Sequence, residues 1–311
     1  MKVYHNTIIG IHGGAGALEP SRYSHDEIQQ YEKILYEVTA YGKELYSEGK
    51  SAVDIACGCV EFMENAEVFN AGRGSVFCSN EKIQMDASVM CGKTQKVGGV
   101  SLLEHVKNPI LLAREVLYHS PHSLLAAEGA EEFARERGFH LCLNDELKTQ
   151  KRYKQLLEAK RKHIVELDHD DKMGTVGAVC LDKAGNLAAA TSTGGMTNKH
   201  YGRVSDSSII GAGTYADNRT CAVSGTGTGD QFIQHVCAYD LHAQIFYGEK
   251  EIREASLNTL NNLQKIGGNG GLAAINQKGE CILPLATKGM FRAVLSQDGS
   301  SCVSIFDRSD Q

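Results

Sequence analysis

The residue types best suited to covalent chemistry meet at one bond in the middle of the chain, between Gly174 and Thr175. A free threonine hydroxyl is a poor nucleophile without a neighbouring base, and no Ser-His-Asp or Cys-His pattern stands nearby to supply one. Cleavage at this bond would make Thr175 a chain N-terminus, whose α-amino group, with a pKa of about 7.7–8.0, serves as the base. Glycine at position 174 allows close approach to the carbonyl under attack. The alternative is that Thr175 is only a β-branched residue that starts a strand.

Two short apolar runs must position this threonine. Residues 175–181 and 187–193 are rich in β-branched and small apolar residues, and residues 182–186 between them have turn chemistry. The pair predicts a β-hairpin whose second strand ends at Thr193. Strands this apolar are expected to be buried on both faces.

The remaining elements are predicted from periodicity and turn residues. A strand over residues 7–11 runs into a glycine cluster, residues 12–17, that is typical of a tight turn. Further strands are predicted before and after the hairpin, with helices on either side of the Gly174-Thr175 bond. This order favours an α+β fold, a two-sheet sandwich with outer helices. Predicted helices include residues 25–50, 52–64, 110–118, 123–137, 231–244 and 251–265.

Charge and composition exclude some classes of protein. The net charge of −6 and the lack of a basic patch with interleaved aromatics argue against a nucleic-acid partner. Residues 144–173 are highly charged and predict an exposed helix that runs into a mobile linker. No transmembrane segment or secretory signal is recognisable, and the ten scattered cysteines are typical of buried, reduced thiols. These features favour a cytoplasmic protein.

Two motifs carry a family resemblance. Gly-Thr-Val-Gly-Ala-Val at 174–179 and Thr-Ser-Thr-Gly-Gly-Met at 191–196 resemble the plant-type L-asparaginase and isoaspartyl peptidase family of N-terminal-nucleophile hydrolases. The likeness extends from residues 12–16 to residues 287–290. It implies an αββα four-layer sandwich that cleaves itself into an alpha subunit, 1–174, and a beta subunit, 175–311. It also implies a dimer of cleaved pairs, a heterotetramer, acting on L-asparagine and β-aspartyl dipeptides.

The resemblance implies a role for each site residue. Thr193 would hydrogen-bond the nucleophile, while the Thr226 hydroxyl and the Gly227 N–H would stabilise the oxyanion. Arg203 would hold the substrate α-carboxylate and Asp206 the α-ammonium. The same residues also fit a surface β-residue, a plain glycine turn and a local ion pair. Backbone lining is implied for Gly229, and supporting roles for Asn70 and Gly13.

A structural sodium site is also implied by the resemblance, with no cofactor for catalysis. Sodium is a hard cation and takes oxygen ligands. An ordinary helix-to-strand loop fits these residues equally well, and Glu67 stands where family members often carry proline. The backbone carbonyls implied are those of Met63, Glu64, Ala66, Phe69, Ala71 and Arg73.

Three other functions remain open from the sequence. Glycosylasparaginases share the fold but usually show Asp-Thr at the cut and a secretory signal. A nucleotide-binding protein would use the glycine loop Gly225–Gly229 at the start of a helix. A processed but catalytically silent interaction module is the third.

Overall fold

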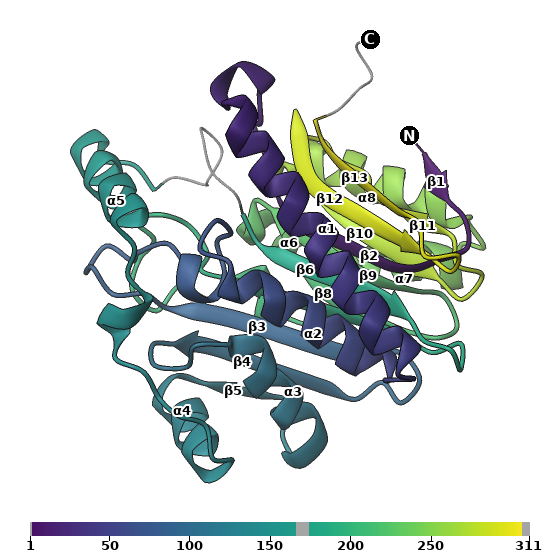
Figure 1. Ribbon diagram of the computed structural model, residues 1–311, viewed down its shortest axis with the longest axis horizontal. Helices are drawn as coiled ribbons and strands as arrows, with labels where there is room; N and C mark the ends of the chain where they lie inside the picture. The colour runs from purple at the N-terminus through teal and green to yellow at the C-terminus, as the bar shows by residue number, and fades with distance from the viewer. Residues whose placement is uncertain (1, 166–173, 307–311) are drawn as a thin grey trace.

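The computed structural model describes residues 2–165 and 174–306, and the strands in these ranges form two sheets (Figure 1). The strands of the larger sheet are β2 (Thr7–Gly16), β3 (Met85–Cys91), β4 (Val97–Leu103), β5 (Leu124–Ala126), β6 (Val176–Leu181), β7 (Leu187–Thr193), β12 (Gly289–Ser296) and β13 (Ser301–Phe306). The strands of the smaller sheet are β1 (Val3–Tyr4), β8 (Thr214–Ala216), β9 (Cys221–Gly227), β10 (Gly270–Asn276) and β11 (Cys281–Ile282).

Strand order mixes early and late parts of the chain. The larger sheet runs β13-β12-β2-β6-β7-β3-β4-β5, and the smaller runs β1-β11-β10-β9-β8. Strand β2 therefore lies between β12 and β6, which both follow the Gly174-Thr175 bond in sequence. All described neighbours pair antiparallel except β4 and β5, which are parallel.

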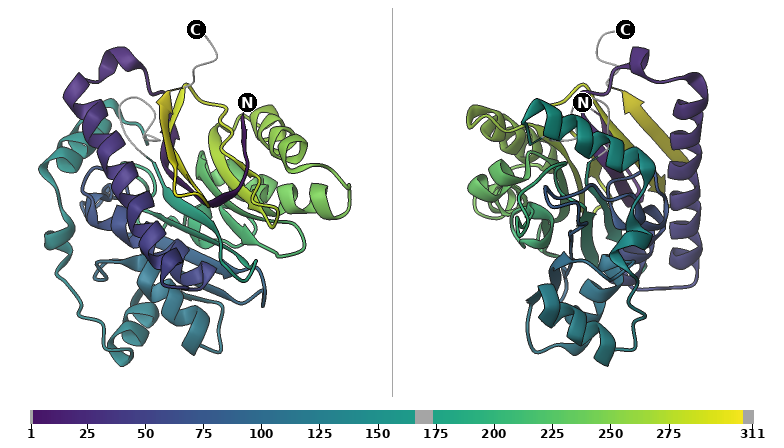
Figure 2. Two further views of the ribbon diagram at one scale, coloured as in Figure 1. Left: turned by 45° about the vertical axis from the view of Figure 1, so that its right-hand side comes forward. Right: turned by 90° about the vertical axis from the view of Figure 1, so that its left-hand side faces the viewer.

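Helices cover the outer face of each sheet, while the inner faces pack together. The α-helices are α1 (His25–Ser47), α2 (Ala52–Asn65), α3 (Pro109–His119), α4 (Ala127–Glu136), α5 (Gln150–Lys162), α6 (Gly229–His235), α7 (Cys237–Phe246) and α8 (Ile252–Lys265), and short 3-10 turns are η1 (Pro20–Arg22), η2 (Gly72–Gly74), η3 (Asn144–Leu147) and η4 (Asp206–Ser208). Helices α1, α2 and α3 lie on the larger sheet, and α7 and α8 on the smaller, as the turned views in Figure 2 show.

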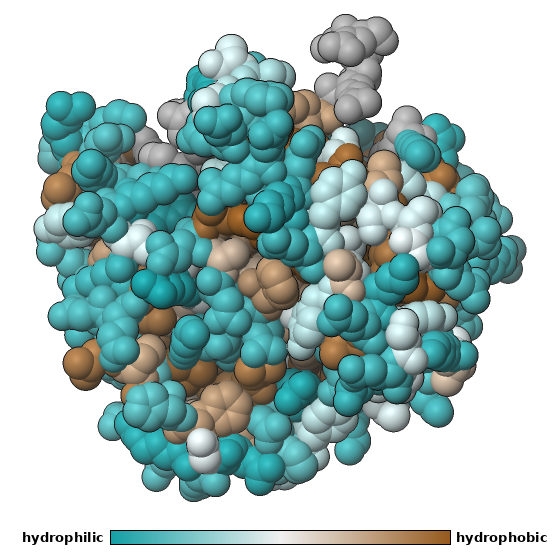
Figure 3. All heavy atoms as spheres, in the orientation of Figure 1, coloured by the Kyte–Doolittle hydropathy of each residue, from teal (hydrophilic) through white to brown (hydrophobic). Residues whose placement is uncertain are grey.

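Three buried apolar clusters hold these layers together. The middle cluster, with Val179, Ala189, Ala222 and Ala273, lies between the sheets, where small side chains allow close packing. Helix α1 begins at a capping box in which Ser24 Oγ accepts the Glu27 N–H and Glu27 accepts the Ser24 N–H. Its outer side is polar, and Figure 3 shows a mainly hydrophilic surface over it.

The mixed α+β class with two sheets is confirmed, and so is the central hairpin. Strands β6 and β7 are almost wholly buried, as their apolar runs predicted. No helix in the described ranges is both long and apolar enough to cross a membrane. All ten cysteines are free thiols, and most are buried, although Cys302 is exposed.

Three local predictions were wrong. The glycine cluster at 12–17 is not a turn, because β2 continues through it to Gly16. The helix over 231–244 is broken at Val236, whose φ of 50° ends α6 before α7 begins. Residues 123–137 divide into β5 and α4.

The charged stretch 144–173 also differs from a linker in its first part. Helices η3 and α5 occupy residues 144–147 and 150–162. Helix α5 buries Arg152, whose Nε donates to the Gly74 carbonyl at 2.7 Å. The rest of that prediction, residues 166–173, lies outside the described residues.

Candidate active site

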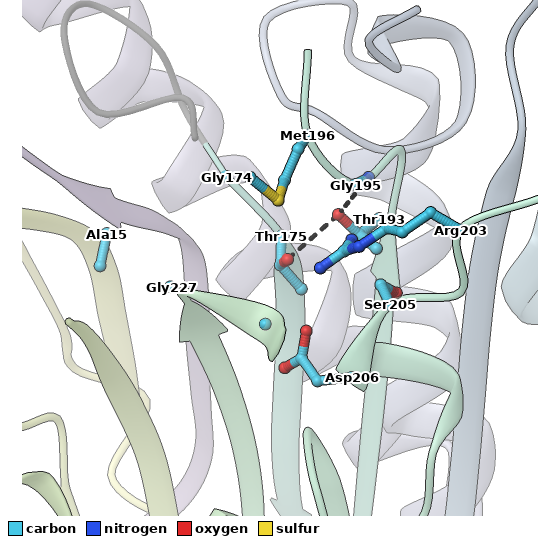
Figure 4. Close-up of a pocket in the computed structure, with 11 residues that line it drawn as sticks. Ala15, Gly174, Thr175, Thr193, Gly195, Met196, Arg203, Ser205, Asp206 and Gly227 are labelled. Carbon is cyan, nitrogen blue, oxygen red and sulfur yellow. Dashed lines mark hydrogen bonds between the residues drawn. The ribbon is translucent and has the colours of Figure 1, made fainter. Parts of the chain in front are cut away.

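The two threonines of the central hairpin face each other. Thr175 directly precedes β6 and Thr193 ends β7, and the register pairs Val176 with Ser192. The Thr175 hydroxyl donates to Thr193 Oγ1 at 3.1 Å, and Thr193 Oγ1 also accepts the Gly195 N–H at 3.0 Å (Figure 4). Both threonines are buried, with Thr175 7% exposed. The hairpin thus fixes the side chain of Thr175 toward a defined acceptor.

A small pocket opens beside Thr175. Residues from both sheets and from the loop after β7 surround it, and Figure 4 shows Thr175, Thr193, Arg203 and Asp206 gathered in it. The structure therefore brings together residues separated by more than two hundred positions in sequence. Its lining residues are Ala15, Gly174, Thr175, Thr193, Gly195, Met196, Arg203, Ser205, Asp206, Gly227 and Gly229.

Gly174 is held between β2 and β9. A Cβ on Gly14 would lie 2.3 Å from the Gly174 nitrogen, so only glycine at position 14 leaves room for this backbone. On the other side, a Cβ on Gly174 would lie 3.2 Å from Thr226 Oγ1. The Thr226 hydroxyl is buried and lies beside Gly174. Gly14 has a φ of 111° and was not assigned a role from the sequence.

Gly227 follows Thr226 at the end of β9. Its φ is 149°, and a Cβ there would lie 2.1 Å from the Asn269 carbonyl oxygen. Both observations require glycine at this position. Its backbone thus lines the pocket at a point that no larger residue can occupy.

Arg203 and Asp206 lie side by side but do not form the local pair considered above. The Arg203 Nε and Nη2 groups donate to Asp230 Oδ1 at 3.2 and 2.8 Å. Asp206 is 3% exposed, and its Oδ2 has no hydrogen-bond partner in the described chain. Burial raises the pKa of Asp206 to about 7, an effect that the nearby Arg203 charge opposes. A Cβ on Gly229 would lie 2.4 Å from Asp206 Oδ1, so this glycine makes room for the carboxylate.

Asn70 braces the turn that follows Thr193. Its Nδ2 donates to the Gly195 carbonyl at 2.7 Å, and its backbone carbonyl accepts the Gly194 N–H at 3.0 Å. Lys199 supports the same turn from the other side, because its buried ammonium donates to the Gly194 carbonyl at 2.6 Å. Burial lowers the pKa of Lys199. Sequence reasoning placed Asn70 near the site but gave Lys199 no role.

Gly13 lies behind the pocket rather than in it. A Cβ at this position would lie 2.3 Å from the ring of Phe69, so Gly13 allows that ring to pack against β2. Its neighbour His12 approaches the nucleophile more closely: the Nδ1 atom of His12 lies 3.1 Å from the Thr175 carbonyl oxygen. In the sequence, the signal for His12 is its position at the start of the segment 12–16, where the family resemblance begins.

Two backbone carbonyls of the α2–η2 region lie close to the glycines of the loop after α2. A Cβ on Gly72 would lie 2.4 Å from the Glu64 carbonyl oxygen, and one on Gly74 would lie 1.9 Å from that of Phe69. Carbonyl oxygens are the kind of ligand that a hard cation takes. Other carbonyls of the expected set, those of Met63, Ala66 and Ala71, accept N–H groups within the loop. The Arg73 side chain instead pairs with Glu67 at 2.9 Å.

Side chains offer no comparable metal site. Within residues 2–165 and 174–306, no group of three or more His, Cys, Asp or Glu side chains could hold a metal ion.

Comparison with known proteins places the chain in a family. The model of the asparaginase family matches residues 5–305. The chain belongs to the asparaginase family. Among its relatives, the isoaspartyl peptidase of Escherichia coli is 45% identical over 294 residues, covering 92% of each chain. The isoaspartyl peptidase/L-asparaginase of Homo sapiens is 38% identical over 288 residues, covering 92% of each chain, and that of Xenopus laevis is 35% identical over 294 residues, covering 94% of this chain and 93% of its own.

The glycine-rich segment of this asparaginase-family chain already holds a carboxylate. Asp206 Oδ1 lies against Gly229 at the first residue of α6, where a nucleotide phosphate would need to bind. Gly225 is close to the ring of Phe232, 2.6 Å from where its Cβ would be. The Phe232 ring therefore fills the space beside Gly225, and the Asp206 carboxyl fills the space beside Gly229, where it would repel a phosphate. This geometry disfavours the nucleotide-binding alternative.

Proposed function

We propose that this chain is a threonine hydrolase that cleaves itself before Thr175 and then hydrolyses β-aspartyl dipeptides and L-asparagine to L-aspartate. One observation carries the proposal: the Thr175 hydroxyl, 3.1 Å from Thr193 Oγ1, shares a pocket with a guanidinium and a buried carboxylate. The relatives above are named isoaspartyl peptidase or isoaspartyl peptidase/L-asparaginase, which supports the same substrates.

The proposed maturation uses the geometry around Gly174. Thr175 Oγ attacks the Gly174 carbonyl carbon, the peptide C–N bond breaks, and the hydroxyl proton passes to the departing nitrogen, which becomes the amine of Thr175. An ester between Gly174 and Thr175 Oγ replaces the amide. Water then hydrolyses the ester to give a carboxylate at Gly174 and to restore the hydroxyl of Thr175. The products are an alpha subunit, 1–174, and a beta subunit, 175–311, that together form an αββα sandwich of the N-terminal-nucleophile type. The Thr226 hydroxyl stabilises the oxyanion, and its position beside Gly174 supports this role.

The proposed turnover repeats this attack on a substrate. The free amine of Thr175 takes the proton of its own hydroxyl, and Oγ attacks the β-carbonyl carbon of the substrate. Thr226 Oγ and the Gly227 N–H stabilise the oxyanion, with preorganised donors worth about 3–4 kcal/mol each. The amine leaves with a proton, and water hydrolyses the β-aspartyl ester to release L-aspartate.

Recognition falls to the charged pair and its glycines. Arg203 directs a guanidinium at the α-carboxylate, and Asp206 offers its unpartnered Oδ2 to the α-ammonium. Gly229 lines the pocket between them. Both charges of an α-amino acid are thereby neutralised, and the β-carbonyl is the group left facing Thr175. Asn70 and Gly13 act behind this layer, through the Gly194–Gly195 turn and the Phe69 ring.

Three further features belong to the proposal. Two cleaved pairs associate, which the exposed aromatic side chains of Tyr239, Phe246 and Tyr247 around α7 support. The loop over 63–73 binds a structural sodium through its carbonyls, and catalysis needs no cofactor. Ten free thiols support a reducing compartment, the cytoplasm.

Intact mass and kinetics test the proposal together. The purified protein is expected to give two polypeptides, the second beginning at Thr175, and to hydrolyse a β-aspartyl dipeptide. A Thr175→Ala variant is expected to remain one chain without activity. An uncleaved protein with full activity contradicts the maturation step. Preference for N-glycosylated asparagine over β-aspartyl dipeptides favours the glycosylasparaginase alternative, and complete cleavage without any hydrolysis favours the interaction module.

A further inference from the structure

His12 lies at the end of a strand ladder that stops just short of the nucleophile. The pairing of β2 with β6 runs from Ile9–Cys180 to His12–Gly177, so Thr175 lies beyond its last pair. The Thr175 carbonyl is thus outside the regular ladder between these strands. His12 supplies the contact there: its Nδ1 lies 3.1 Å from that carbonyl oxygen, and its side chain is fully buried.

Gly177 creates the space in which the imidazole of His12 meets the second sheet. A Cβ on Gly177 would lie 2.0 Å from Ser224 Oγ and 2.4 Å from His12 Nε2. Without that Cβ, His12 Nε2 and Ser224 Oγ approach to 2.8 Å. Ser224 lies on β9, two residues before Thr226, so the same strand holds the imidazole and the oxyanion hydroxyl.

The hydrogen bonds around His12 allow one assignment of its protons. The Thr175 carbonyl oxygen can only accept, so Nδ1 must carry the hydrogen. Nε2 is then the acceptor of a hydrogen bond that the Ser224 hydroxyl donates. Burial lowers the pKa of His12 to about 4, which keeps the ring neutral near pH 7.

A chain of buried hydroxyls maintains this arrangement. Because the Ser224 hydroxyl donates to His12, Ser224 Oγ must be the acceptor in its 2.7 Å contact with Thr191 Oγ1. Thr214 Oγ1 in turn donates to Thr191 Oγ1 at 2.6 Å. Every bond points toward Thr175, and aligned bonds of this kind strengthen one another. The chain links β8, β7, β9 and β2 to the carbonyl of the nucleophile.

We propose that His12, held by Ser224 as the neutral tautomer with its hydrogen on Nδ1, is the positioning residue of Thr175. The inference rests on the proposed function. The bond to the carbonyl fixes the backbone of Thr175 after cleavage, when no preceding residue restrains its N-terminal side. Oγ and the free amine then keep one orientation relative to the substrate. His12 touches neither substrate nor the reacting atoms, and acts only through Thr175.

Conservative variants separate positioning from folding. Asparagine places an amide N–H where His12 has Nδ1, whereas glutamine reaches only the Nε2 position. His12→Ala is expected to lower kcat about 100-fold, the loss that a small misplacement produces, with little change in KM. His12→Asn is expected to recover most of that loss and His12→Gln little of it. His242→Asn is the matched control, since His242 is also buried and its Nδ1 contacts the Thr220 hydroxyl, away from the site.

The tautomer itself gives a readout that needs no substrate. Two-bond ¹H–¹⁵N correlation spectra of the wild-type protein are expected to show a protonated Nδ1 and a bare Nε2 for His12. Ser224→Ala is expected to lower kcat, because His12 Nε2 loses its donor and the ring is held less firmly, while the Thr175 carbonyl keeps the hydrogen on Nδ1. His12 protonated on Nε2, or His12→Ala and His12→Asn with equal kcat, would overturn the inference. If His12→Ala does not fold, the His12→Asn kinetics and the spectra still decide. A wild-type protein that shows the Nδ1–H tautomer but no β-aspartyl hydrolysis counts against the proposed function instead.

Discussion

Asp206 should cost the protein stability at neutral pH, and removing its charge should recover it. The carboxyl is 3% exposed, and burial raises its pKa from 3.8 to about 7. Each pKa unit corresponds to about 1.4 kcal/mol, so the whole shift corresponds to about 4 kcal/mol. The folded state is less stable by this amount when the buried Asp206 carboxyl is charged. We therefore expect Asp206→Asn to stabilise the fold well above pH 7 by up to about 4 kcal/mol.

The pH dependence fixes the sign of this prediction. The folded-state pKa of Asp206 lies above the unfolded value, so its favourable contribution is fully present below pH 3.8 and is lost as the pH rises through about 7. The difference between Asp206→Asn and the parent should be near zero at about pH 4 and should grow to its full value at about pH 8. Activity moves the other way, because the neutral amide of the variant no longer offers a charge to the substrate ammonium.

Urea unfolding followed by circular dichroism is the suitable assay, since the chain contains no tryptophan. Both proteins should carry Thr175→Ala, so that each remains one covalent chain during unfolding. Asp230→Asn is the matched control: this carboxylate also contacts Arg203 but is exposed, and its loss should change the unfolding free energy by less than about 1 kcal/mol. A difference for Asp206→Asn that is the same at both pH values, or a destabilisation at the higher one, would refute the reasoning.

Other substitutions test the remaining contacts of the site. Arg203→Lys should raise KM for a β-aspartyl dipeptide at least about tenfold with a smaller change in kcat, because an ammonium cannot reproduce the fork of the guanidinium; an unchanged KM would contradict this. Gly14→Ala should block maturation on a denaturing gel, because the new Cβ would lie 2.3 Å from the Gly174 nitrogen, whereas Gly129→Ala, with nothing within 4 Å, should mature normally. Thr193→Val should slow both maturation and turnover about tenfold by removing one hydrogen bond to the nucleophile, and equal rates would refute that role.

The sequence was sufficient to predict the central hairpin. The apolar runs on either side of a turn are a local signal, and burial of both strands follows from their composition. The bond between residues 174 and 175 could also be recognised locally, because a charged stretch ends there and an apolar strand begins. Assignment of Arg203, Asp206 and Thr226 to one site depended on the family resemblance, since their spacing alone fits ordinary loops.

Contacts between side chains and distant parts of the chain could not be predicted from local sequence patterns. Arg203 is bound by Asp230, which is 27 residues away, and not by Asp206, three residues away. Arg152 looked like one cation of an exposed helix, yet it is buried against Gly74. In each case the pairing depends on how distant elements pack, and a charge carries no periodicity that would reveal it.

The glycines at the end of β2 explain why a turn was wrongly predicted there. The cluster from Gly13 to Gly16 has turn composition, but here it allows close approach of other groups within a strand: the Phe69 ring at one position and the Gly174 backbone at the next. Glycine without a side chain serves both purposes, and only the tertiary neighbours distinguish them.

The strand order has a consequence for the protein after the proposed cleavage. β2, from the first segment, is clasped between β12 and β6 from the second, while β3 from the first segment flanks β7. After the proposed cleavage the two polypeptides would share the larger sheet, so neither could leave without breaking its strand pairing. The two products of one chain should therefore stay together. Mixing two mature proteins of different sequence should yield no hybrid pairs.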